Sequence, residues 1–306
     1  MRIGTSGWHY PGAGGWNGLF YPKPRPRGFD ELAFYGRQFD TVEINSTFYG
    51  QPRPEIAGAW AAKTPAGFRF SVKLYQQFTH PRMFRERVTR DLVRRLDSPD
   101  VPEAGIAGLI AANAHDLDTF KRGIDPLATA GKLGPLLAQF PASFKDDSES
   151  RAHLAALLRA FGGYSVAVEL RHRTWSDNQA QTVQFLNVFG AAWVQIDEPK
   201  FRDSIRQDFA PTEAPFFYLR LHGRNAKNWW HHAKPEDRYD YLYSVEELQP
   251  MAETLQTAHA AGKAVYAYTN NHKNAQATIN AQQLKALVGE ALPARVGADR
   301  KSLREA

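Results

Sequence analysis

The sequence predicts an α/β fold, a single (β/α)8 barrel, because short apolar segments alternate with longer amphipathic ones along the chain. Eight short segments have the length and the β-branched or aromatic content of buried strands. These segments are 2–6, 41–45, 68–73, 133–140, 165–171, 191–197, 216–222 and 264–270. Seven longer segments have helical periodicity: 29–38, 54–63, 116–130, 150–161, 177–189, 245–260 and 281–292.

Strands that alternate with helices pair in parallel, because tight hairpins cannot join consecutive parallel strands. Eight such units suit a closed barrel. An open, doubly wound sheet is the alternative, but that fold usually has a glycine fingerprint after its first strand. Here Gly4-Thr5-Ser6-Gly7-Trp8 and Gly12-Ala13-Gly14-Gly15 do not match that spacing.

We expect one domain over residues 1–306, since barrels of this length are common. Residues 81–115 are predicted to be an insertion after the third strand, with the Pro- and Asp-containing stretch 98–102 interrupting two helical patterns. The last residues, 295–306, are expected to form a flexible tail.

The composition excludes several classes of protein. Apolar residues make up 43% of the chain and aromatic residues 12%, which is enough for a large core and excludes a disordered chain. The chain has no cysteine, which excludes disulfides, thiolate metal ligands and a cysteine nucleophile. Residues 1–6 do not have the pattern of a signal peptide, and no apolar run reaches the ~18 residues of a membrane helix, so we expect a cytoplasmic protein without membrane contact.

The formal net charge of +6 favours anionic partners. The denser basic runs are 82–95 and 295–304. These runs suit contacts with nucleic acid, and they equally suit solvated helix surfaces and a frayed tail.

Alternation along the strands predicts which side chains face the barrel axis. In 68–73, for example, the apolar residues face the helices and Arg69, Ser71 and Lys73 face inward. In 191–197 we assign Trp193, Gln195 and Asp197 to the inward side. The same test gives the remaining inward side chains of the second, fifth and seventh strands: Glu43, Asn45, Glu169, Arg171, Tyr218, Arg220 and His222.

Ionisable groups therefore gather at the carboxyl ends of the strands, where barrel enzymes have their active sites. The candidate catalytic residues are Glu43, Lys73, Glu169, Asp197 and His222. Four inward cations face three inward anions, so the surplus cation is expected to meet a ligand anion, water or another partner. The alternative is a network of salt bridges that only fills the barrel.

Lys73 suits a general base, a Schiff-base amine or an anion clamp, and it equally suits a simple partner for a carboxylate. Glu43 and Glu169 suit an acid and a base if their environments differ. Together with Asp197 and His222 they would also form an oxygen-rich site for a divalent metal. The interleaved Arg and Lys residues would repel a cation, so a metal is not favoured, and the sequence indicates no other cofactor.

The loops after the seventh and eighth strands are expected to bind the ligand. Arg224, with backbone amides near Gly223, suits a phosphate. Trp229 suits stacking on a sugar or a base, or packing in an aromatic lid. Asn270 and Asn271 suit hydrogen bonds to a polar ligand, or turn and cap interactions.

At these residues the chain resembles the YecE-like family, domain of unknown function 72. The resembling segments are Gly4-Thr5-Ser6-Gly7-Trp8, Val42-Glu43-Ile44-Asn45-Ser46-Thr47-Phe48-Tyr49, Phe70-Ser71-Val72-Lys73, Leu133-Gly134-Pro135-Leu136-Leu137-Ala138-Gln139-Phe140-Pro141, Glu169-Leu170-Arg171-His172, Arg220-Leu221-His222-Gly223-Arg224, Tyr239-Asp240-Tyr241-Leu242-Tyr243 and Asn270-Asn271-His272. The resemblance covers nearly the whole chain and implies a TIM barrel, without a settled activity or cofactor. The chain differs from the family's pattern in segment 81–115 and at Thr269, where an aromatic residue is usual.

The favoured hypothesis is an acid–base enzyme, of hydrolase or isomerase type, that acts on a phosphorylated or sugar-like substrate. The candidate substrate-binding residues are Asn45, Arg171, His172, Arg220, Arg224, Trp229, Asn270 and Asn271. The alternatives are a nucleic-acid protein with a basic aromatic rim and a barrel that binds a small molecule without turnover. The sequence does not indicate the substrate or the oligomeric state.

Overall fold

Parallel strands close into a barrel in the computed structural model, which describes residues 1–96 and 112–289. The strand order is β6-β5-β4-β3-β2-β1-β9-β8-β7, and all the neighbouring pairs are parallel. The strands are β1 (Arg2–Ser6), β2 (Thr41–Ile44), β3 (Arg69–Lys73), β4 (Leu133–Gln139), β5 (Val166–Glu169), β6 (Ala192–Trp193), β7 (Gln195–Asp197), β8 (Phe216–Leu221) and β9 (Ala264–Thr269).

Two of these nine strands share one position in the barrel. β6 pairs with β5 and β7 pairs with β8, and only Val194 separates them. The Val194 amide still donates to the Val168 carbonyl at 2.9 Å, so the chain keeps its place between β5 and β8. The barrel therefore has eight strand positions, as the sequence predicts.

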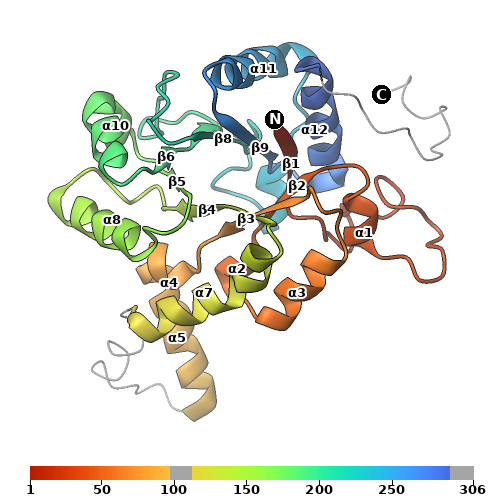
Figure 1. Cartoon of the computed structure of the whole chain (residues 1–306), viewed down its shortest axis with the longest axis horizontal. Coiled ribbons are helices and arrows are strands. Elements are labelled where there is room, and N and C mark those ends of the chain that lie inside the picture. Colours follow the sequence, from red (N-terminus) through yellow and green to blue (C-terminus); the bar gives the residue numbers. More distant parts are fainter. Residues whose placement is uncertain (97–111, 290–306) are drawn as a thin grey trace.

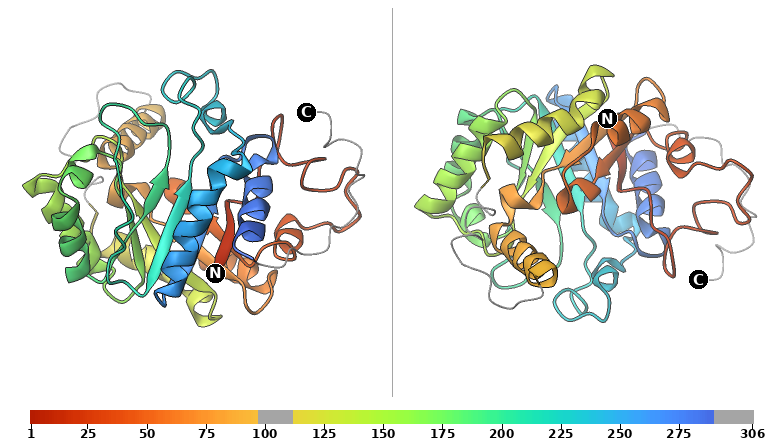
Figure 2. Two further views of the ribbon diagram at one scale, coloured as in Figure 1. Left: turned by 90° about the horizontal axis from the view of Figure 1, so that it is seen from above. Right: turned by 90° about the horizontal axis from the view of Figure 1, so that it is seen from below.

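Helices surround the barrel, and Figure 2 shows them outside the strands in two further views. The α-helices are α1 (Glu31–Tyr35), α2 (Ser46–Tyr49), α3 (Pro54–Ala62), α4 (Gln76–Thr79), α5 (Pro81–Leu96), α7 (Ala114–Thr129), α8 (Ser148–Ala160), α9 (Arg173–Asp177), α10 (Gln179–Val188), α11 (Val245–Ala260) and α12 (Gln276–Leu287). The 3₁₀ helices are η1 (Pro235–Tyr239) and η2 (Lys273–Ala275). Side chains satisfy free amides at several helix starts, as in the capping boxes of Asn113 with Asp116 and of Ser244 with Glu247.

The predicted fold class is confirmed, while some helix boundaries differ. The last helix begins at Gln276, five residues before the predicted start, because Asn274 and Ala275 take left-handed backbone conformations and end the preceding turn. The predicted insertion begins with a 16-residue helix, α5, where the sequence has the first of its two helical patterns. The rest of its centre, 97–111, and the predicted tail, 295–306, lie outside the described residues.

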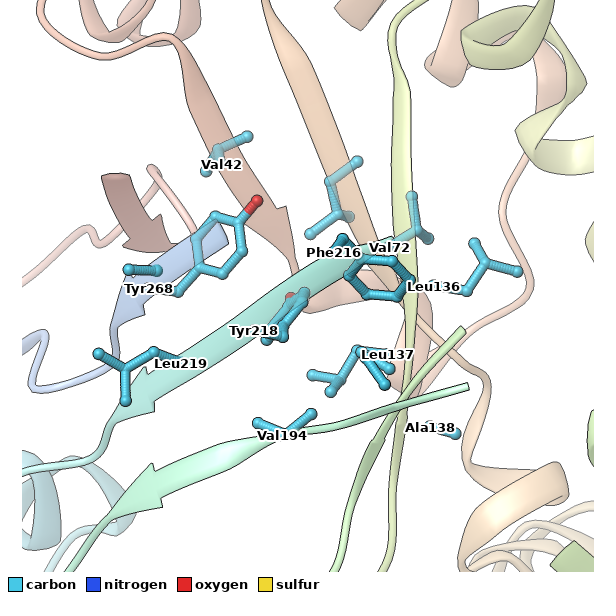
Figure 3. Close-up of a cluster of buried hydrophobic side chains, with 14 of the residues drawn as sticks. Val42, Val72, Leu136, Leu137, Ala138, Val194, Phe216, Tyr218, Leu219 and Tyr268 are labelled. Carbon is cyan, nitrogen blue, oxygen red and sulfur yellow. The ribbon is translucent and has the colours of Figure 1, made fainter. Parts of the chain in front are cut away.

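Side chains fill the barrel axis below its carboxyl end (Figure 3). The Tyr268 hydroxyl lies 2.7 Å from Thr41 Oγ1 and 2.8 Å from Ser71 Oγ, and all three residues are buried. Leu137 and Tyr218 are buried as well, and they lie in the same cluster in Figure 3. Because the axis is packed, a ligand has access only at the end of the barrel.

The register corrects the predicted orientation of the sixth strand. Asp197 pairs with Leu221, while the inward-facing Arg220 pairs with Ile196. Paired residues of parallel strands point to the same side of a sheet, so Asp197 points away from the axis. The same holds for Trp193 and Gln195. The prediction was wrong because the inward positions here are apolar, and polarity alone misleads where the barrel interior is packed.

No helix in the described ranges is both long and apolar enough to cross a membrane.

Candidate functional site

A buried guanidinium group joins three strands at the carboxyl end of the barrel. Arg220, on β8, is 1% exposed, and its Nη2 donates to Glu43 Oε1 on β2 at 2.7 Å. Its Nη1 donates to Glu169 Oε2 on β5 and to Gln139 Oε1 on β4, the latter at 3.1 Å. Both carboxylates are fully buried. A buried charge is costly unless it is paired and hydrogen-bonded, and here each carboxylate has such a partner.

Glu43 has further donors on both of its oxygens. Ser6 Oγ donates to Oε1 at 2.8 Å, and the Tyr218 hydroxyl donates to Oε2 at 2.7 Å. With Arg220, three donors from β1 and β8 hold this carboxylate. Its position is therefore fixed by strands rather than by loops, which is typical of a precisely held site.

Arg171, two residues after the end of β5, continues the ion-pair network. Its Nε donates to Glu169 Oε1 at 2.7 Å, and its Nη1 lies 3.4 Å from Glu198 Oε2. Burial alone would raise the pKa of Glu169, but Arg220 and Arg171 outweigh it and hold that pKa well below its ordinary value. Glu169 is therefore an anion, with the two cations on either side of it.

His222, immediately after β8, is a neutral side chain within this network. Burial first, and then the charge of Arg171, lower its pKa to about 3. Arg171 Nη2 lies 3.0 Å from His222 Nε2, so Nε2 accepts a hydrogen bond from the guanidinium group. The Asn270 side-chain amide lies 3.0 Å from Nδ1 and fixes the ring from the other side.

A cavity of about 310 Å³ opens directly above this network, and we call it the Lys73 cavity. Its polar lining includes Asn45, Lys73, Gln139, Arg220 and Asn270. Asn45 Oδ1 is buried there without a hydrogen-bond partner among the described residues. The cavity therefore combines cationic groups with an unused acceptor.

Lys73 forms no salt bridge within the part of the chain that the structure describes. Its Nζ lies 4.1 Å from the centroid of the Phe48 ring. Burial, and then the neighbouring charge of Arg220, lower the pKa of Lys73 to about 7 against the attraction of Glu169 and Glu43. Lys73, like Arg69, is thus an inward cation without a carboxylate partner in the described ranges, and Lys73 is ionised only in part at neutral pH.

Aromatic residues from two loops form another wall of the Lys73 cavity. Tyr10, in the β1–α1 loop, stacks on His272 with ring centroids 4.3 Å apart. Tyr239, at the end of η1, contacts the same imidazole at 5.0 Å. These rings bring together parts of the chain that lie far apart in the sequence.

The structure brings most of the predicted site residues together. Those at or directly beside the Lys73 cavity are Glu43, Asn45, Lys73, Glu169, Arg171, Arg220, His222 and Asn270. Trp229 is 4% exposed and lies edge-on to His222, with ring centroids 6.5 Å apart.

Four predicted site residues have structural contacts elsewhere. Asp197 accepts two hydrogen bonds of 2.8 Å from Arg224 and one of 2.7 Å from Tyr243, on the outer side of β7. His172 caps α9 through Thr174, and Asn271 binds the Tyr241 carbonyl and Asn280. The proposed ligand-binding roles of Arg224, His172 and Asn271, and the catalytic role of Asp197, do not fit these positions because their polar groups bind other parts of the fold.

Several site residues were not predicted from the sequence. Gln139 ends β4 on the inward side, where the alternation used for other strands would have found it. Glu198 follows β7 by one residue and was missed because the parity of that strand was reversed. Tyr10 and Tyr239 come from loops, in which no periodicity indicates where a side chain points.

The carboxylates do not form a metal centre in the described ranges, which contain no group of three or more His, Asp or Glu side chains placed to hold an ion. Glu43 and Glu169 both bind Arg220, so a guanidinium group occupies the position between them.

The fold and the site define an α/β barrel protein with a polar, ion-paired cavity at the carboxyl end of its strands. Residues 2–302 match the family described as "Protein of unknown function DUF72", and the chain belongs to this family. The resemblance noted in the sequence is thereby confirmed.

Relatives of this chain carry names without an activity. The UPF0759 protein YunF of Bacillus subtilis is 27% identical over 299 residues, which cover 94% of each chain. The UPF0759 protein YecE of Escherichia coli K12 is 35% identical over 88 residues, 28% of this chain and 32% of that protein.

Solved structures of the same family share the barrel. A DUF72 family protein from Thermotoga maritima matches with a TM-score of 0.73 and 32% identity, over 94% of this chain and 99% of that one. Another from Enterococcus faecalis matches with a TM-score of 0.76 and 22% identity, over 97% and 99% of the two chains.

Replacing Arg220 tests how much the fold depends on the buried network. We expect Arg220→Met to lower the free energy of unfolding by about 3–5 kcal/mol, because two buried carboxylates lose their shared cation. The matched control is Arg173→Met, which removes a 37% exposed side chain from its exposed pair with Asp177 and should change the stability little. Urea denaturation at neutral pH measures both. Equal costs for the two variants would contradict the importance given to Arg220.

Proposed function

We propose that the Lys73 cavity is an acid–base active site, of hydrolase or isomerase type, for a small phosphorylated or sugar-like substrate. Lys73 transfers the proton and contacts the anionic or hydroxyl-bearing part of the substrate. Glu43, Glu169, Arg171 and Arg220 form the charged floor against which the substrate lies.

The observation that carries this proposal is the state of Lys73. An amine with a pKa of about 7 exchanges its proton readily at neutral pH, which is what a general acid or base requires. Most lysines at a charged barrel end would be paired with a carboxylate, but here both buried carboxylates of the floor bind Arg220 instead. The amine is thus left for a ligand.

The substrate class follows from the groups around Lys73. Protonated Lys73 favours a negative or electron-rich group, the Glu236 carboxylate accepts from hydroxyl groups, and the amides of Asn45, Gln139 and Asn270 offer both donors and acceptors. A phosphorylated or polyhydroxylated molecule matches such a lining better than an apolar one.

Binding of a simple anion tests the role of Lys73 as a cation. We expect sulfate, whose own charge is constant from pH 6 to 8, to bind about tenfold more weakly at pH 8 than at pH 6, because Lys73 loses its proton in this range. Isothermal titration measures the affinity. Lys73→Met should abolish the pH dependence, while Lys63→Met, on the exposed end of α3, should keep it. A pH-independent affinity in the wild type would count against the proposal.

Stability against pH tests the same group without any ligand. The folded pKa of Lys73, about 7, is below its ordinary 10.5, so the unfolded chain binds the extra proton between these values and stability rises with pH across this window. Lys73→Met should therefore stabilise the fold most below pH 7, by on the order of 1 kcal/mol because the amine is partly solvated, and progressively less toward pH 10.

Lys132 provides the matched control for that measurement. Its Nζ donates to the carbonyls of Ala61 and Thr64, each at 2.6 Å, so it is a buried lysine with partners. Lys132→Met should destabilise the fold by about 2 kcal/mol. If both variants lose stability alike at pH 7, Lys73 is a structural cation and the proposed role fails.

Turnover tests the chemistry itself. On a panel of sugar phosphates, any activity found should fall by about 10²-fold or more in Lys73→Met and in Glu169→Gln. Glu253→Gln, an exposed carboxylate on α11, is the control and should keep the activity. Unchanged turnover in both site variants would reject the assignment. Saturable, Lys73-dependent binding without turnover would instead indicate a barrel that only binds its ligand.

A further inference from the structure

A second cavity lies beside the Lys73 cavity, on the far side of Glu169. It has a volume of about 210 Å³, and we call it the tryptophan pocket. Its lining includes Arg171, Glu198, Phe201, Ser204, Trp229 and Trp230. A water molecule takes up about 30 Å³ in the liquid, so this volume equals that of several water molecules and is large enough for one substituted six-membered ring.

One aromatic face is open in this pocket. Trp230 is 57% exposed, and its ring lies 5.8 Å from that of Phe201 at an interplanar angle of 51°. Trp229, its neighbour in sequence, is 4% exposed and packs against His222. Trp229 therefore belongs to the protein interior, whereas the indole of Trp230 is free to stack on a ligand.

The inner wall carries an incompletely satisfied carboxyl group. Glu198 is 5% exposed and is held by one ion pair of 3.4 Å to Arg171. This contact does not have the geometry of a hydrogen bond, so Glu198 Oε2 has no hydrogen-bond partner among the described residues. Burial raises the pKa of Glu198, because Arg171 also serves Glu169 and compensates only part of the cost. A hydroxyl-bearing ligand would supply the missing hydrogen bonds.

The chemistry of the pocket favours a sugar ring over a nucleobase. A carboxyl beside a guanidinium presents acceptors and donors side by side, and a vicinal diol matches both because each hydroxyl donates and accepts. A planar base is commonly held between two parallel faces. Here the second ring, Phe201, is strongly tilted, so the pocket offers one stacking face with polar groups at its side.

The two cavities are connected through one buried carboxylate, Glu169, which lines neither of them. Arg220 in the Lys73 cavity and Arg171 in the tryptophan pocket bind opposite oxygens of Glu169. A ligand with two parts would contact Arg220 with one part and Arg171 with the other, above the buried Glu169.

We propose that the tryptophan pocket binds the pyranose ring of a sugar-containing substrate, stacked on Trp230 and hydrogen-bonded to Glu198 and Arg171. This inference rests on the proposed function of the Lys73 cavity for the position of the remaining, anionic part of the substrate. The pocket itself is a binding site for an uncharged sugar ring.

Uncharged glycosides test the pocket separately from Lys73. The probes are the methyl glycosides of glucose, galactose and mannose, with adenosine and cytidine as the base-containing alternatives. Saturation-transfer NMR and titration at millimolar concentration measure binding to the whole protein. We expect at least one glycoside to bind, about tenfold more weakly in Trp230→Ala and several-fold more weakly in Glu198→Gln. Phe209→Ala, which removes another exposed aromatic ring, is the matched control and should bind as the wild type does.

The variant Lys73→Met distinguishes the two proposals. Glycoside binding that survives Lys73→Met but not Trp230→Ala supports the sugar pocket, even if the acid–base role of Lys73 fails. Absence of binding by all three glycosides, or equal binding by wild type and Trp230→Ala, overturns the inference. Trp230-dependent binding of the nucleosides alone overturns the assignment to a sugar.

Discussion

Arg220 is a cation that the barrel encloses almost completely, and the arrangement of the whole site depends on its two ion pairs. It binds Glu43 and Glu169, and Arg171 then binds Glu169 and Glu198. The charges therefore alternate in a chain of five side chains across the barrel end. Removing Arg220 leaves Glu43 buried without an ion pair, and removing Arg171 does the same to Glu198, which is far more costly than losing an exposed salt bridge.

This chain of charges explains why Lys73 is different from the other cations. The carboxylates nearest to it already bind Arg220 or Arg171, and the positive charge of Arg220 opposes its protonation. Lys73 lies on β3, next to β2 and its Glu43, and its Nζ contacts an aromatic ring instead of a carboxylate. Without Arg220 the pKa of Lys73 would rise, because a repelling charge would be lost and Glu43 would lose its ion pair, but burial would still hold it below the ordinary value.

The strands can be predicted from the sequence because the face that each one turns toward the helices is buried and apolar. The alternation with these apolar residues fixes the inward orientation of Glu43, Lys73, Glu169 and Arg220. It fails for 191–197, where Val194 and Ile196 fill the axis and the polar residues face outward. The pattern of polar and apolar residues shows which positions share a face of the strand. Which of the two faces points toward the barrel axis is decided by pairing with β5 and β8, which are far away in the sequence. The hydrogen bonds from Arg224 to Asp197 likewise depend on contacts between segments that are separated in the sequence.

Strands and loops contribute different things to the two cavities. The ion-paired floor comes from strand ends, whose positions are fixed by the ladder of the barrel. The aromatic walls come from the β1–α1 loop with Tyr10 and from the β8–α11 loop with Trp229, Trp230 and Tyr239. Under the proposed function, the charged floor of this chain supports the acid–base chemistry and the aromatic walls select the ligand, because loops can change without altering the barrel. Glu169 connects the two cavities, because it binds Arg220, which lines the Lys73 cavity, and Arg171, which lines the tryptophan pocket.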